Sequence, residues 1–183
     1  MRAMLIAAAF ALPLAACNKE PSVSATNATP GEVAEKVAAT DAITVQPGRW
    51  EGSMTIHELD FPGMPANVKK QMMQQMGGAK TFANCVTEED VKQQKAFFTG
   101  EGKDTNCKYD HFNLSGGKVD AAMSCTPTNG KMSMTMAGTY SAESYHLDMT
   151  TRADGAGPTN GMTMKMTVDA KRTGACTGGK DEL

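Results

Sequence analysis

The sequence contains few aromatic side chains and no excess of charge of one sign. Phe, Tyr and Trp make up 5% of the 183 residues, and 18 Lys and Arg side chains are balanced by 20 Asp and Glu side chains. This balance gives no basic surface for nucleic acid, which we therefore exclude as a partner. Apolar runs are too short for a protein that crosses a membrane several times. With 15 Met residues, the core of one modest domain must be built largely from thioethers and small side chains.

Motifs of the common enzyme classes are also missing. There is no nucleophile elbow GxSxG, no zinc-binding HExxH, no phosphate-binding loop and no dinucleotide fingerprint. No two cysteines have CxxC spacing, so a thioredoxin-type site and a zinc ribbon have no support. The candidate acids Glu58, Asp110 and Asp148 are scattered along the chain. The sequence therefore predicts no enzymatic activity and no cofactor.

The N-terminus has the pattern of a secretory signal peptide. Arg2 precedes an apolar run over residues 3–12, and Leu14-Ala15-Ala16-Cys17 resembles the lipobox of bacterial lipoproteins. This resemblance implies that residues 1–16 are removed and that Cys17 carries acyl chains on its sulfur and its new amino group. The membrane is then a partner through Cys17. In lipoproteins of the enterobacterial type, a residue other than Asp directly after the acylated cysteine favours the outer membrane. Asn18 therefore predicts the inner leaflet of the outer membrane, facing the periplasm.

The C-terminal residues Lys180-Asp181-Glu182-Leu183 match the signal that retains proteins in the endoplasmic reticulum. Under that alternative, Asn27 and Asn113 would be glycosylation acceptors. A four-residue match arises easily by chance, whereas the lipobox has a specific architecture at the correct end of the chain. We therefore interpret the retention match as coincidental and residues 179–183 as a solvated tail.

Residues 17–45 have the composition of a lipid-anchored flexible linker. They lack Leu, Phe, Tyr, Trp and Met, and they are rich in Ala, Thr and Ser. The sequence allows a short helix over residues 32–40, but we expect the segment to contribute little core. A coil of this length would hold the domain about 30 Å from the membrane.

Beyond the linker, apolar and polar residues alternate with the period of a β-strand, first around Trp50. Two-residue turn signals follow at Gly116-Gly117 and Asn129-Gly130, and Ala142-Glu143 fits a third turn. With these turns, apolar residues face apolar residues across every hairpin. The predicted opposite pairs include Leu114 and Val119, Met123 and Met136, Cys125 and Met134, Tyr140 and Tyr145, and Met136 and Met149.

The domain is predicted over residues 46–178 and is mainly β. A five-strand antiparallel meander, with the Trp50 strand as a sixth, forms a curved sheet or a small barrel. A short helical insertion occupies about residues 65–98. It contains one helix over residues 67–75, a candidate to cover the sheet, and a second helix with Thr87 as its N-cap.

Four cysteines remain once Cys17 is assigned to the anchor, namely Cys85, Cys107, Cys125 and Cys176. An even number in an exported domain predicts two disulfides, for which the sequence permits three pairings. In the predicted register Cys107 faces Thr126 and lies on the opposite face from Cys125, which disfavours a bridge between these two. We prefer Cys85–Cys107 with Cys125–Cys176, and the crossed pairing is the alternative.

Several segments together resemble the DUF3617 family of uncharacterised bacterial exported proteins. They are Pro47-Gly48-Arg49-Trp50-Glu51, Phe61-Pro62-Gly63-Met64-Pro65, Cys85-Val86-Thr87-Glu88-Glu89-Asp90, the strands of Cys107 and Cys125, and Lys171-Arg172-Thr173-Gly174-Ala175-Cys176. The resemblance covers roughly residues 46–178. It implies an exported, cysteine-containing β-rich domain, and it brings no catalytic residues.

Methionines at alternate positions of two predicted strands suggest two kinds of site. Thioethers are soft ligands that suit Cu(I), and sulfurs on strands ~4.8 Å apart could converge. Met-rich walls can instead repack around a small hydrophobic ligand, or they can fill a closed core. The three histidines, at 57, 111 and 146, fall on the opposite face and add nothing to a copper site. The candidate ligands are Met132, Met134, Met136, Met162, Met164 and Met166.

From the sequence we expect a lipid-anchored periplasmic lipoprotein that is a non-enzymatic binding or interaction module of the cell envelope. Its partner would be a hydrophobic ligand or another envelope protein. The alternatives are a copper-handling protein that uses the Met-rich sheet face, and a carrier of a small hydrophobic ligand.

Overall fold

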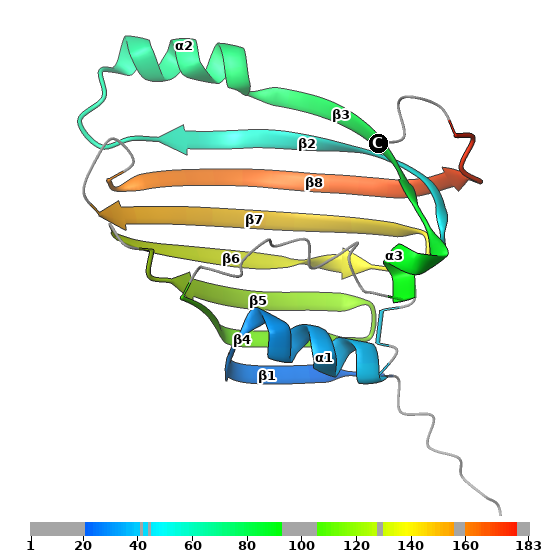
Figure 1. Ribbon diagram of the computed structural model, residues 1–183. Helices are drawn as coiled ribbons and strands as arrows, with labels where there is room; N and C mark the ends of the chain where they lie inside the picture. Colours follow the sequence, from blue (N-terminus) through cyan, green and yellow to red (C-terminus); the bar gives the residue numbers. More distant parts are fainter. Residues whose placement is uncertain are drawn as a thin grey trace, which may run out of the picture.

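The computed structural model describes residues 21–40, 42–43, 45–92, 106–127, 130–155 and 160–178. They form one curved antiparallel sheet of eight strands in the order β1-β4-β5-β6-β7-β8-β2-β3 (Figure 1). The strands are β1 (Val23–Ala28), β2 (Gly48–Asp60), β3 (Gly78–Val86), β4 (Cys107–Ser115), β5 (Lys118–Cys125), β6 (Gly130–Tyr140), β7 (Ser144–Gly155) and β8 (Met162–Gly174). The helices are α1 (Pro30–Thr40), α2 (Ala66–Met76) and α3 (Glu88–Lys92). The signal peptide, Cys17, residues 93–98 of the expected insertion and the tail at 179–183 lie outside the described residues.

The predicted antiparallel meander is confirmed. Strands β4 to β8 are neighbours in both chain and sheet, and β2, which contains Trp50, pairs with β8 as the sixth strand. Gly116 and Gly117 have φ values of 56° and 70°, as the two central residues of a type I′ hairpin turn require. In the described part of the chain β1 and β3 are the two edges of the sheet, which makes it an open curved sheet and not a barrel.

One predicted register is wrong by two residues. Met123 is opposite Met134 and Cys125 is opposite Met132, where the two-residue turn would have placed Met136 and Met134. Asn129 lies outside the described residues, but the amide of Gly130 donates to the carbonyl of Pro127 at 3.3 Å. Gly130 therefore follows the turn and is not one of its central residues, which moves the register by two. Because side chains on a strand alternate with period two, a shift of two keeps every methionine on its predicted face.

Part of the expected linker belongs to the folded domain, which corrects the prediction for residues 17–45. Strand β1 pairs with β4, with Val23 opposite Leu114, and α1 lies against the concave side of the sheet (Figure 1). Val33 and Val37 of α1 are completely buried. β-Branched side chains and Ala therefore suffice to bury this segment, although it contains no Leu, Met or aromatic residue.

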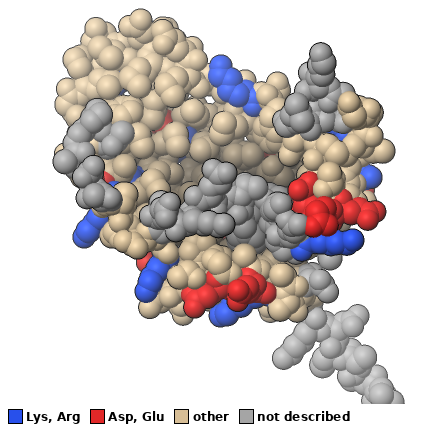
Figure 2. Space-filling view, in the orientation of Figure 1, with Lys and Arg blue, Asp and Glu red and all other residues tan. Residues whose placement is uncertain are grey.

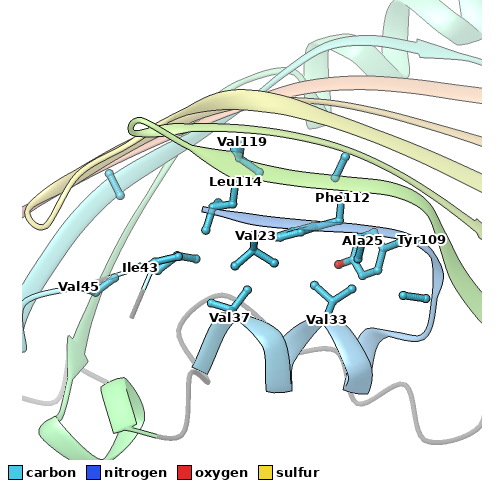
Figure 3. Close-up of a cluster of buried hydrophobic side chains, with 14 of the residues drawn as sticks. Val23, Ala25, Val33, Val37, Ile43, Val45, Tyr109, Phe112, Leu114 and Val119 are labelled. Atoms are coloured by element: carbon cyan, nitrogen blue, oxygen red, sulfur yellow. The ribbon is translucent and has the colours of Figure 1, made fainter. Parts of the chain in front are cut away.

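Helix α1 encloses the main hydrophobic cluster between itself and the edge of the sheet. Thr29 and Glu32 form a capping box, in which the amide of Thr29 donates to Glu32 Oε2 at 2.7 Å and the amide of Glu32 donates to Thr29 Oγ1 at 3.3 Å. Phe112 and Leu114 of β4 are each 2% exposed and lie over the two valines of α1 (Figure 3). The cluster comprises Val23, Ala25, Ala28, Val33, Val37, Ala42, Ile43, Val45, Trp50, Val86, Tyr109, Phe112, Leu114, Val119, Ala121 and Ala170.

The two helices of the insertion are confirmed where the structure describes them. Helix α2 ends at the C-cap Gly77, and Thr87 caps α3 by accepting a hydrogen bond from the amide of Asp90 at 3.1 Å. Helix α2 does not cover the sheet as we expected. It lies beside the end of β2 and leads into the edge strand β3 (Figure 1), and its Lys69 forms an ion pair with Asp60 of β2. Its apolar side remains partly open, with Met76 45% exposed.

The disulfides join Cys85 to Cys176 and Cys107 to Cys125, so both preferred bridges, Cys85–Cys107 and Cys125–Cys176, are wrong. A β-bulge in β4 explains the second bridge. Tyr109 is opposite Met123 but His111 is opposite Ala122, so Asp110 is an extra residue. This extra residue moves Cys107 directly opposite Cys125, on the same face.

The Cys85–Cys176 bridge depends on a strand that the sequence did not predict. Strand β3 pairs with β2 on the side away from β8. Arg49 of β2 is opposite Cys85 on one side and opposite Gly174 on the other. The chain after Gly174 therefore has only the end of β2 to cross before it reaches β3. The two bridges fasten opposite ends of the sheet.

Candidate ligand-binding face

The concave side of the sheet carries a continuous set of methionines, which we call the methionine face. They share this side with the buried core, because Met136 is directly opposite Ala121, which is 3% exposed. All are half-buried except Met54, which is 36% exposed. The methionine face consists of Met54, Met123, Met132, Met134, Met136, Met149, Met162, Met164 and Met166.

The two predicted methionine runs lie on the same face, but they are not on adjacent strands. Strand β7 separates β6 from β8. Met136 and Met166 are both opposite Met149, which therefore forms the centre of a three-methionine row. The predicted ligand set omitted Met149, although the predicted hairpin already placed it opposite Met136.

An apolar cavity of about 150 Å³ lies beside the methionine face. Three of its lining residues belong to one cross-strand row in which Val119, Gly138, Leu147 and Val168 are paired in turn. Gly138 adds no side chain to this row, and a Cβ there would collide with the carbonyl oxygen of His146. The close approach of the two strands therefore requires glycine here, so no side chain occupies the centre of the row. The lining is Ile43, Tyr109, Phe112, Leu114, Val119, Met136, Tyr140, Tyr145, Leu147 and Val168.

Aromatic side chains stiffen two walls of this cavity. Tyr109 contacts Phe112 edge-on at 5.3 Å between ring centroids, and Tyr145 stacks on Trp50 at 5.9 Å. Burial raises the pKa of both Tyr109 and Tyr145, which keeps their phenols neutral. Tyr140 donates a hydrogen bond to the carbonyl of Ala42 at 3.1 Å. The cavity is therefore neutral and mostly apolar, which suits an uncharged guest.

The outer face of the sheet is polar and carries the three histidines, as predicted. His57 Nε2 lies 2.7 Å from Thr167 Oγ1, and Thr167 donates to Asp148 at 2.9 Å. His146 Nδ1 lies 2.6 Å from Asp169 and its Nε2 lies 3.5 Å from Asp148. The hydrogen bond with Asp169, together with the charges of both carboxylates, raises the pKa of His146. This network is open to water.

The outer network does not have the order of a catalytic triad. In a triad the histidine lies between the hydroxyl and the carboxylate, whereas in this protein the hydroxyl of Thr167 lies between His57 and Asp148. The two other candidate acids are paired with side chains, Glu58 with Lys165 and Asp110 with Ser124.

The described residues give no indication of a strongly charged site. Acidic side chains gather over α1 and α3 with basic ones beside them, while the surface is hollowed between α2 and α1 (Figure 2). Within the described ranges, no three His, Cys, Asp or Glu side chains could hold a metal ion. None of the helices there is long and apolar enough to cross a bilayer.

Comparison with known proteins leads to one family. No curated protein and no solved structure matches the chain. A family model described as "Protein of unknown function (DUF3617)" matches residues 45–176. The match includes β2 to β8 and all four disulfide cysteines, whereas β1 and α1, which complete the core, precede it. The chain is therefore a member of the DUF3617 family.

Proposed function

We propose that this protein is a lipid-anchored lipoprotein of the bacterial envelope that works as a non-enzymatic binding module. The lipobox pattern at Cys17 supports the anchor, and Asn18 favours the inner leaflet of the outer membrane, facing the periplasm. The neutral cavity beside the methionine face supports binding of a small hydrophobic ligand. Four of the five cysteines are paired in two disulfides, which agrees with an oxidising compartment.

The anchor is tested by replacing the acylated cysteine. Native protein should sediment with the outer membrane, and mass spectrometry of its N-terminal peptide should find acyl chains on Cys17. The Cys17→Ser protein should lack the acyl mass and leave the outer-membrane fraction. A mature N-terminus at another residue, without lipid, would contradict the anchor.

The cavity is the observation that carries the binding proposal. An apolar cavity of about 150 Å³ can stay dry and take up a small apolar molecule such as benzene. The adjoining methionines have flexible, polarisable side chains that can repack around a longer guest. The site would thus admit a slender apolar molecule whose remainder lies along the methionine face.

A cavity-filling substitution tests ligand binding directly. Native mass spectrometry would measure adducts of small aromatic and aliphatic probes on the Cys17→Ser protein. Val168→Phe should fill the cavity and abolish the adducts without loss of stability, because the new ring occupies empty space. The matched control is Thr163→Phe, on the same strand but on the outer face of the sheet, which should leave binding unchanged. Equal binding by both variants would exclude the cavity as the site.

Copper handling is the second candidate, because Met136, Met149 and Met166 are directly opposite one another. Opposite Cβ atoms lie ~4.5–5.5 Å apart, so three thioethers could meet at one Cu(I). Titration of metal-free protein with Cu(I) against a chromophoric competitor should then saturate at one ion. Changing Met136, Met149 and Met166 together to Leu should abolish this saturable Cu(I) binding, since Leu keeps the apolar volume but has no sulfur. Absence of saturable binding in the unaltered protein would end this idea.

A further inference from the structure

Pro21, the first residue that the structure describes, lies at one end of the sheet. Pro21 lines a shallow hollow of about 260 Å³ together with the β4–β5 turn and the β6–β7 turn. Strand β2 also begins at this end, whereas α2 lies at the opposite end (Figure 1). The residues around the hollow are all uncharged: Pro21, Ala42, Gly116, Gly117, Tyr140, Ser141 and Ala142. We call this part of the molecule the anchor end.

The apolar cavity lies immediately behind the anchor end. Tyr140 lines both the shallow hollow and the cavity. Ala42 lines the hollow and Ile43 lines the cavity, so the short segment after α1 separates the two spaces. The hydrogen bond from Tyr140 to the carbonyl of Ala42 fastens that segment across the opening. Neutral surface therefore leads from the anchor end to the cavity.

The chain length between Cys17 and Pro21 limits how far the anchor end can lie from the bilayer. Four residues span at most about 14 Å when fully extended. The hydrocarbon core of a bilayer is ~30 Å thick, so each leaflet contains chains of ~15 Å. A lipid chain that leaves the leaflet can bridge the remaining distance to the cavity.

We propose that the cavity accepts an acyl chain of a lipid from the membrane in which Cys17 is anchored. The chain enters at the anchor end between Ala42 and Tyr140 and continues along the methionine face. This inference rests on the proposed function, and it specifies the ligand class and its source. The small uncharged residues of the hollow let the lipid headgroup stay in the interfacial water, while only the chain is desolvated.

Trp50 provides a built-in reporter for this event. It is the only tryptophan of the sequence, it is 3% exposed, and it stacks on Tyr145, which lines the cavity. Bromine atoms on an acyl chain quench tryptophan fluorescence only at short range. Quenching of Trp50 therefore reports a chain inside the cavity, because a chain that stays in the bilayer cannot reach it.

The experiment compares acylated full-length mature protein in vesicles whose phospholipids carry brominated or ordinary chains. Brominated vesicles should quench Trp50. Val168→Phe should abolish the quenching, and Thr163→Phe, on the outer face of the same strand, should retain it. A parallel arm adds brominated fatty acid to the Cys17→Ser protein in solution, where Val168→Phe should weaken binding at least about tenfold, or ~1.4 kcal/mol.

The two arms separate this inference from the proposed function. Quenching in solution without quenching in vesicles overturns the membrane source but leaves a hydrophobic-ligand site. If the acylated protein does not bind fatty acid and the Cys17→Ser protein does, the protein's own acyl chain occupies the cavity. That outcome excludes a lipid of the bilayer as the ligand. If neither arm quenches while circular dichroism shows folded protein, both the inference and the binding proposal fail.

Discussion

At the scale of single residues, Phe112 is the side chain on which the core depends most. It is 2% exposed, contacts Tyr109 edge-on and lies over α1 (Figure 3). Phe112→Ala should lower the free energy of unfolding by about 3–5 kcal/mol, because it leaves a cavity under the helix. Urea unfolding of the two proteins would measure this. Met54→Ala, at an exposed site on the same face, is the control and should cost much less.

His146 offers a prediction about ionisation on the outer face. The Asp169 hydrogen bond raises its pKa, so the favourable pair is fully present below the unfolded pKa of about 6.5 and is lost as pH rises through the higher folded pKa. Titration by NMR should find the His146 pKa above 6.5. Asp169→Asn should lower it, whereas Asp120→Asn, beside His111, should leave it unchanged. If the pKa of His146 is unchanged in both variants, the hydrogen bond with Asp169 is absent in solution.

Tyr140 should control the rate of ligand uptake. Its hydroxyl donates to the carbonyl of Ala42 across the opening of the cavity, and such a bond contributes about 1 kcal/mol. Tyr140→Phe should therefore accelerate both binding and release of fatty acid, with little change in affinity. Stopped-flow measurement of Trp50 quenching would detect this. Tyr145→Phe, which lines the same cavity, should not change the rates.

At the scale of elements, the two disulfides should contribute unequally to stability. Cys85–Cys176 closes a loop with a sequence separation of 91, whereas Cys107–Cys125 closes one of 18. Loop-closure entropy then gives ~4.5 kcal/mol for the first and ~3 kcal/mol for the second. Replacing both cysteines of one bridge with Ser, and measuring thermal unfolding, should find the greater loss for Cys85 and Cys176. Peptide mapping without reduction would confirm the pairing.

The meander was predictable because its evidence is local. Alternation identifies each strand, and the turn at Gly116-Gly117 fixes its hairpin. The bulge at Asp110 was not predictable, because a polar residue in a polar position gives no signal. This single extra residue brings Cys107 opposite Cys125 and so makes possible the bridge that the predicted register disfavoured. A helix over residues 32–40 was allowed by the sequence, but its packing into the core was missed, because composition suggested a linker. The spacing of Val33 and Val37 on one helix face was the available clue.

The candidate site was predictable only in part. The methionine face follows from periodicity, which is insensitive to a shift of two residues. The cavity depends on Gly138, which interrupts an apolar row between Val119 and Leu147. A glycine inside a strand pattern often marks a close backbone approach, so the clue existed, but the space it leaves depends on neighbours from other strands.

At the scale of the whole molecule, the folded N-terminal segment changes the expected distance from the membrane. The described fold begins four residues after Cys17, so the proposed anchor would hold it at most ~14 Å from the bilayer, and not at the expected 30 Å. Inserting a flexible Gly-Ser segment of about 20 residues after Cys17 should abolish Trp50 quenching by brominated vesicles. Binding of fatty acid in solution should stay the same. Quenching that survives the insertion would show that proximity does not matter.

The order of the strands also determines when each part of the chain can find its partner during folding. Hairpins β4 to β8 join neighbours in sequence, so little loop-closure entropy opposes them. Strand β1 must wait for β4, whereas β2 can pair early with β3 and must wait only for β8. A nascent chain therefore carries the β2–β3 pair apart from the meander until β8 has emerged. In that interval the second edge of β2 and the growing edge of the meander are both unpaired, which is the stage most open to aggregation.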